Sequence, residues 1–163
     1  MSRDTAIRPQ SIKPDADLAI TNLNSVNVSI LLGDGTGSFS PAPGSPYPVS
    51  SKPLFTPSSP FGIAVGNFNA DSAPDLVVGS QATSIYVMFG NANGSFTTTP
   101  DSTILMGDEP PTPGSEPVPQ TVATGDLDGD GFDDIVSANS GDNSVSVVLG
   151  NGDGTFDPKT QFD

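Results

Sequence analysis

One pattern occurs three times in this chain at nearly constant spacing. In each copy a glycine (Gly33, Gly90 or Gly150) precedes a turn rich in Gly, Asn or Asp that ends in a phenylalanine. Upstream, an aspartate followed by an apolar run repeats in the same register, as Asp17-Leu-Ala-Ile, Asp75-Leu-Val-Val and Asp134-Ile-Val-Ser. A fixed period of roughly 60 residues is typical of supersecondary units that stack or are arranged radially. We therefore expect a fold built from three similar units.

The segments inside each unit have the period of β-strands. Residues 25–32 and 143–149 alternate apolar and polar side chains before a short apolar run, and residues 84–89 are a shorter, more apolar version. Alternation bounded by Gly and Asn indicates strands. The glycine-rich turns that follow suit hairpins, whose positive φ angles favour Gly and Asn. Each unit is thus expected to hold four antiparallel strands, which is one blade of a β-propeller.

The expected fold class is all-β, with about three blades of a partial propeller in one domain. Residues 1–49 form a degenerate first blade, residues 61–107 the second, and residues 118–163 the third. Two proline-rich connections, residues 50–60 and 108–117, separate them. Because propellers typically have 4–8 blades, three blades must stay open, assemble with other copies, or belong to a larger protein.

The third unit contains a candidate calcium loop. Its aspartates at relative positions 1, 3, 5 and 9 are Asp126, Asp128, Asp130 and Asp134. Gly131 allows a sharp bend that turns the third carboxylate and the Phe132 carbonyl toward the same centre. Hard oxygen ligands gathered by a tight loop suit Ca²⁺, whereas Mg²⁺ holds its water more strongly. An EF-hand would need a Glu where Ser137 stands. The alternative is an acidic Asp-Gly turn exposed to water.

The same frame is weaker in the other two units. In the second unit the candidate ligands are the side chains of Asn67, Asn69, Asp71 and Asp75 and the carbonyl of Ala73. This candidate second site has two formal negative charges instead of four, so it should be weak or empty, or an ordinary turn. In the first unit the equivalent positions hold Pro9, Ser11, Lys13 and Asp17. A lysine among the ligands would repel the ion, so we expect no site there.

The third unit resembles a known family of repeats. The runs from Gly125 to Ile135 and from Ser144 to Phe156 are similar to FG-GAP/VCBS repeats. The second unit carries the pattern well and the first only in part. The resemblance implies blades like those of the integrin α-subunit head and of many bacterial surface and secreted proteins. It also implies calcium in the loop between the first two strands of a blade, and it says little about which ligand is recognised.

The composition excludes several classes of function. The net charge is −14, with 17 Asp but only 2 Glu, and no Lys or Arg lies between Pro53 and Pro158. Phosphate contacts depend on basic residues, so we expect neither nucleic acid nor unaided docking to anionic lipid. The absence of His and Cys excludes a Ser-His-Asp triad, imidazole or thiolate metal ligands, and disulfides. Paired carboxylates remain formally open, but both glutamates lie in a proline-rich connection, so we expect no enzyme.

The sequence also indicates where the protein is located relative to the cell. No apolar stretch approaches the ~20 residues of a membrane span, so we expect no membrane insertion. The start of the chain, Met1–Ala6, lacks the apolar core of a signal peptide. We expect a piece of a longer protein that is extracellular or lies at the cell surface.

Two functions from different classes fit these features. The first is a non-catalytic, calcium-binding module for interaction or adhesion, with an extracellular protein or glycan as its ligand. The second is an accessory, substrate-targeting domain of a secreted hydrolase or lyase. The absence of Trp and the presence of only 2 Tyr weaken a lectin. The proline-rich connections could carry the ligand surface, with Tyr47, Phe55 and Phe61 as exposed anchors, although Phe61 could equally belong to the core.

The end blades lack an obvious polar cap. We expect their uncovered faces to be lined by Val26, Val28 and Ile30 in the first blade and by Val145 and Val147 in the third. Uncovered apolar faces favour self-association. We therefore expect a homo-oligomer that completes a propeller ring, such as a dimer with six blades. The alternative is a loosely ordered monomer kept apart by its negative charge.

Overall fold

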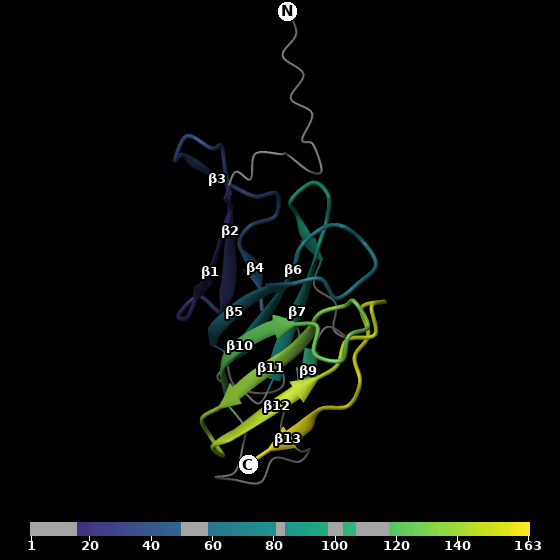
Figure 1. Cartoon of the computed structure of the whole chain (residues 1–163). Helices are drawn as coiled ribbons and strands as arrows, with labels where there is room; N and C mark the ends of the chain where they lie inside the picture. Colours follow the sequence, from purple (N-terminus) through teal and green to yellow (C-terminus); the bar gives the residue numbers. More distant parts are fainter. Residues whose placement is uncertain (1–15, 50–58, 81–83, 98–102, 107–117) are drawn as a thin grey trace, which may run out of the picture.

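The computed structural model describes residues 16–49, 59–80, 84–97, 103–106 and 118–163. Within these residues the secondary structure is β-strand, without a helix, and the strands form three antiparallel sheets (Figure 1). The predicted all-β class is confirmed. No helix in the described residues has the length and apolarity to cross a membrane. The first loop at residues 9–13 and nearly all of both proline-rich connections lie outside the described residues.

Each sheet comes from one repeat. The first contains β1 (Leu18–Asn22), β2 (Asn27–Gly33), β3 (Phe39–Pro41) and β4 (Tyr47–Pro48). The second contains β5 (Pro60–Gly66), β6 (Asp75–Ser80), β7 (Ser84–Gly90), β8 (Phe96–Thr97) and β9 (Thr103–Leu105). The third contains β10 (Pro119–Gly125), β11 (Asp134–Asn139), β12 (Ser144–Val148) and β13 (Thr160–Phe162).

The three sheets share one connectivity, except that the first has no counterpart of β5 and β10 in the described residues. In the third sheet the order is β10-β11-β12-β13, and in the second it is β5-β6-β7-β8, with β9 also paired to β7. In the first sheet the order is β1-β2-β3, with β4 also paired to β2. Because β1 follows Asp17 as β6 begins at Asp75 and β11 at Asp134, β1 corresponds to the second strand of the other two sheets.

The hydrophobic core lies between the sheets in two clusters. One joins the first and second sheets through Val28 and Ile30 on one side and Leu76 and Val78 on the other. The other joins the second and third sheets, and Val77 belongs to it. Successive side chains of a strand point to opposite faces, so β6 serves both clusters and all six of its residues are buried.

The first edges of the sheets lie side by side. Thr21 Oγ1 of β1 donates a hydrogen bond to the Phe61 carbonyl of β5 at 3.0 Å. Thr124 Oγ1 of β10 donates to the Val65 carbonyl of the same strand at 2.5 Å. The second and third sheets also approach closely at Gly79, where an added Cβ would lie 2.4 Å from the Pro119 carbonyl oxygen. The strand β5 therefore lies between β1 of the first sheet and β10 of the third.

The prediction that Val28 and Ile30 line an uncovered face was wrong. They are 0% and 3% exposed because they face the second sheet. Val26 is partly buried against the same cluster. In the third sheet Val145 is 40% exposed and Val147 is half-buried. Alternation separates the two faces of a strand, but it does not say which face meets the neighbouring sheet.

Candidate metal centre and the repeated aspartates

The loop between β10 and β11 is shaped by hydrogen bonds from its backbone to its own aspartates. Asp126 Oδ1 accepts from the Gly129 amide at 2.7 Å, and Asp126 Oδ2 accepts from the Gly131 amide at 3.0 Å. Gly129 and Gly131 have φ angles of 85° and 95°. Residues with a Cβ rarely adopt this region, so the two glycines allow the loop to curl around Asp126. The bend predicted at Gly131 is present.

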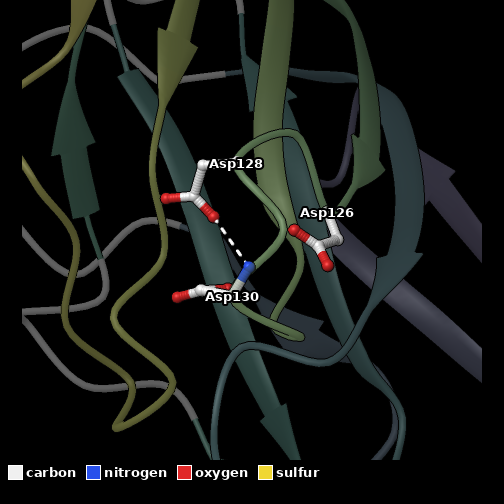
Figure 2. A group of neighbouring side chains, drawn as sticks. All are labelled: Asp126, Asp128 and Asp130. Carbon is white, nitrogen blue, oxygen red and sulfur yellow. Dashed lines mark hydrogen bonds between the residues drawn. The ribbon is translucent and has the colours of Figure 1, made fainter.

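The next two aspartates each accept from an amide two residues further on. Asp128 Oδ1 accepts from the Asp130 amide at 3.1 Å, and Asp130 Oδ1 accepts from the Phe132 amide at 2.8 Å. Figure 2 shows Asp126, Asp128 and Asp130 on this loop, with the bond between Asp128 and Asp130 dashed. Turns of this kind fix the direction of a short side chain without a partner elsewhere in the fold. The orientation of the three carboxylates is therefore set locally.

These three carboxylates form an acidic cluster. One carboxylate oxygen from each of Asp126, Asp128 and Asp130 lies within 4.8 Å of the others, and all three residues are exposed. Lys159 is the only basic residue in the described part of the chain. Its Nζ donates to the Met106 carbonyl and, at 3.0 Å, to Gln161 Oε1. The hydrogen bonds of this cation therefore lie elsewhere. Three converging carboxylate oxygens are the ligands that a hard cation such as Ca²⁺ prefers.

Asp134 differs from the other aspartates of its loop. It is fully buried and is not a member of the cluster. Its Oδ2 accepts from the Leu127 amide at 2.7 Å, and its Oδ1 accepts from the Gly150 amide at 2.9 Å. One carboxylate thus ties the start of the loop to the end of β12. The backbone amides of Leu127 and Gly150 therefore both donate to a carboxylate, which is a stronger acceptor than a neutral oxygen.

The same arrangement recurs in the second repeat and in part in the first. Asp75, also fully buried, accepts from the Phe68 and Gly90 amides, both at 2.9 Å. Asp17 accepts from the Gly33 amide at 2.9 Å. We call Asp17, Asp75 and Asp134 the clamp aspartates. The sequence carried a signal for this role, because Asp17 and Gly33 persist in a repeat that has lost the ligand frame.

One clamp aspartate, Asp75, has a shifted pKa. Burial raises the pKa of Asp75 above its ordinary value of 3.8, and hydrogen bonds from Phe68 and Gly90 oppose this effect. Repulsion from Asp71 raises the pKa further. In the exposed turns the direction is opposite, since hydrogen bonds from the hydroxyl and amide of a following threonine lower the pKa of Asp34 and of Asp153.

The second loop has fewer converging carboxylates. Asn69 Oδ1 accepts from the Asp71 amide at 3.0 Å, and Asp71 Oδ1 accepts from the Ala73 amide at 2.8 Å. The acidic cluster found within the described residues does not include this loop. The fourth predicted ligand, Asp75, is committed to the clamp. The frame therefore forms the same turns as the third loop with less charge.

Asn67, the remaining predicted ligand, joins two blades. Its amide donates to Asp133 Oδ2 at 2.8 Å, and its carbonyl accepts from the Asp133 amide at 3.1 Å. Asp133 lies in the third loop, between Phe132 and Asp134. The ring of Phe132 packs so closely on the hairpin after β12 that a Cβ at Gly152 would lie 2.3 Å from it. Sequence analysis missed the role of Asp133, which no repeat spacing marks.

The predicted aromatic anchors are not all exposed. Tyr47 is 8% exposed, so its prediction as a surface anchor was wrong. Its ring packs edge-on against Phe96 with centroids 5.8 Å apart, and its hydroxyl donates to the Pro43 carbonyl. Phe61 is 37% exposed, and Phe55 lies outside the described residues. A tyrosine beside prolines was buried because its ring reaches across to the second blade.

Three sheets of one connectivity, packed face to face and each with a clamp aspartate, define a protein of repeated β-blades. A family model described as FG-GAP-like repeat matches residues 67–137 and, again, residues 126–163. The chain therefore belongs to the FG-GAP-like repeat family, as its third unit suggested. A comparison with curated proteins found no match.

Proposed function

We propose that this chain is a non-catalytic, calcium-binding β-propeller repeat module that serves interaction or adhesion with an extracellular protein or glycan. The observation that carries the calcium part is the convergence of Asp126, Asp128 and Asp130 within 4.8 Å. Three like charges this close repel one another in the free protein. A bound divalent cation would remove that repulsion, with the Phe132 carbonyl and Asp134 as the other expected ligands.

Calcium should therefore stabilise the fold. Extracellular modules bind Ca²⁺ with Kd values of ~10⁻⁴–10⁻³ M. An ion that binds only the native state, present at ten times its Kd, raises the free energy of unfolding by about 1.4 kcal/mol. Calorimetric titration should show calcium heat, and the Tm should fall on addition of chelator. A titration without heat, together with an unchanged Tm, would contradict the proposal.

Two matched substitutions separate the loops. Asp128→Ala should abolish most of the calcium-dependent rise in Tm, because one of three clustered carboxylates is lost. Asn69→Ala removes the side chain at the same position of the second loop and should change that rise little. Both variants lose one hydrogen bond from an amide two residues on, so their calcium-independent losses are matched. Equal effects on the calcium response would show that charge does not decide the site.

We also propose that copies of the chain associate to complete a ring. The supporting observation is apolar exposure on the sheets at the two ends, where Ile20 is 41%, Val145 40% and Phe162 56% exposed. Val145 and Phe162 are directly paired across β12 and β13 and so share one face. Light scattering in calcium buffer at physiological salt should give an oligomer mass. A compact monomer with protected amides in all three repeats would contradict this proposal.

A further inference from the structure

A pocket of about 380 Å³ lies between the first and second sheets, at the end where the clamp aspartates are found. Its wall is mostly apolar and includes Ile30 of β2, Leu76 of β6 and the ring of Phe96. The wall also includes the carboxylate of Asp17 and the side chain of Val65, a residue of β5 that is 59% exposed. Pockets of this size and character commonly receive a ligand.

The molecule contains a filled version of the same space. Between the second and third sheets the ring of Phe68 is fully buried and packs edge-on against Phe156, with centroids 5.5 Å apart. The Phe68 amide donates to Asp75 Oδ2 at 2.9 Å, and the Phe68 carbonyl accepts from the Gly154 amide at 2.9 Å. One aromatic residue thus fills this gap and is held by its backbone on both sides.

The residues that hold Phe68 have counterparts in the open pocket. Each counterpart lies one repeat earlier in the chain: Phe96 corresponds to Phe156, Gly94 to Gly154 and Asp17 to Asp75. All three counterparts line the pocket. Asp17 Oδ1 already accepts from the Gly33 amide. No donor in the described part of the chain reaches its other oxygen, which is the one that holds the Phe68 amide in the second repeat. The Gly94 amide donates to Asn91 within its own turn, so one of the two backbone contacts is free to form.

Tyr47 packs edge-on against Phe96 but is not among the residues that line the pocket, so in the described part of the chain no aromatic side chain takes the place of Phe68 there. In the repeat register, the position of Phe68 corresponds to Gln10. A glutamine amide buried without partners in an apolar pocket costs free energy, so this residue type does not suit the space. We propose that the pocket binds an extended segment of a partner protein that inserts one Phe-sized aromatic side chain and donates a backbone N–H to Asp17.

The charge of the pocket further restricts which partner segments fit. Asp17 is the charged residue in the wall of the pocket, and the chain carries a net charge of −14. A segment with a lysine or arginine beside the aromatic residue would therefore associate faster and at low salt bind more tightly. This inference rests on the proposed function only in taking a protein as the partner, since the pocket shares no residue with the calcium loop at residues 126–134.

The test uses the full chain and a peptide copied from its own filled site. The probe is a fluorescein-labelled peptide with the sequence of residues 63–70 followed by two lysines, and the control peptide has Gln in place of Phe. In fluorescence anisotropy at low salt the Phe peptide should bind at least about tenfold more tightly than the control. Equal binding of both peptides, or no binding of the Phe peptide at millimolar concentration, would overturn the proposal. The second result is also expected if residues 1–15 or another copy of the chain fill the pocket.

Two tryptophan substitutions locate the binding. Ala92→Trp places a large side chain on an exposed turn that lines the pocket, and should weaken peptide binding at least about tenfold. Ala70→Trp, on an exposed turn outside the pocket, should leave it unchanged. Binding that survives Ala92→Trp would place the peptide elsewhere and overturn the proposal. The Tm shift with calcium, measured on the same samples, reports separately on the loop at residues 126–134.

Discussion

The three clamp aspartates should differ in their contribution to stability according to the amides that they hold. Asp75 accepts from two buried amides, those of Phe68 and Gly90. Asp134 accepts from the buried amide of Gly150 and the part-buried amide of Leu127. Asp17 accepts from one exposed amide, that of Gly33. Substitution by Ala removes the acceptor and leaves these amides without it, so the loss should follow this order.

The loss of stability in each variant depends on whether water can replace the carboxylate as the acceptor of the amide hydrogen bond. A buried donor left without a partner costs about 1–3 kcal/mol, while a lost hydrogen bond whose donor reaches water costs about 0.5–1.5 kcal/mol. Asp75→Ala should therefore lower the free energy of unfolding by about 2–6 kcal/mol and Asp134→Ala by about 1.5–4.5 kcal/mol. Asp17→Ala should cost only about 0.5–1.5 kcal/mol. The first two are large fractions of a typical domain stability of about 5–15 kcal/mol.

Urea denaturation followed by circular dichroism, with chelator present, measures these losses without a contribution from calcium. A loss for Asp17→Ala as large as for the buried pair would refute the reasoning, because amide burial would then not set the cost. Repeating the series with calcium tests Asp134 as a ligand. If its clamp role dominates, Asp134→Ala should cost nearly as much in chelator as in calcium. A loss that appears only with calcium would show that it acts through the ion.

Three further predictions concern packing and pH. Phe68→Ala empties the space between the second and third sheets and should cost about 3–5 kcal/mol, whereas Phe61→Ala, at a site 37% exposed, should cost much less in the same denaturation assay. Gly79→Ala should cost about 1–3 kcal/mol, because its Cβ would lie 2.4 Å from a backbone oxygen; an unchanged urea midpoint would contradict that close approach. Because the folded-state pKa of Asp75 is raised, the folded protein holds this proton more tightly than the unfolded chain. The stability of the wild type relative to Asp75→Asn should therefore be highest below the ordinary value of 3.8 and fall as pH rises through the raised pKa, and Tm values measured between about pH 3 and pH 7 check the sign.

The strands could be predicted from the sequence because their signals are local. The alternation in residues 143–149 and the turn glycines depend on neighbours a few positions away, and β12 was found there. The cluster of Asp126, Asp128 and Asp130 was predictable for the same reason, since one tight loop places all three carboxylates.

What the sequence did not reveal depends on contacts between strands of one repeat and between repeats. Spacing placed Asp134 and Asp75 in a ligand frame, but it did not show that their oxygens accept from the Gly150 and Gly90 amides at the far end of the next strand. Tyr47 was expected at the surface because it lies among prolines, yet it is buried against Phe96 of the next repeat. Partners of this kind are decided by the packing of strands and sheets, which local sequence patterns do not reveal.

The burial of β6 on both faces has a consequence for how the chain is made. A ribosome that has released only the first two repeats presents a middle sheet whose Val77, Ile85 and Val87 have no cover until the third repeat follows. Chains are synthesised from the N-terminus at roughly 5–20 residues per second, so the stretch still to come leaves this surface open for seconds. Exposed apolar strands in that interval are targets for chaperones and for aggregation. Expression yield should therefore depend on translation speed between residues 106 and 163 more than on the stability of the finished protein.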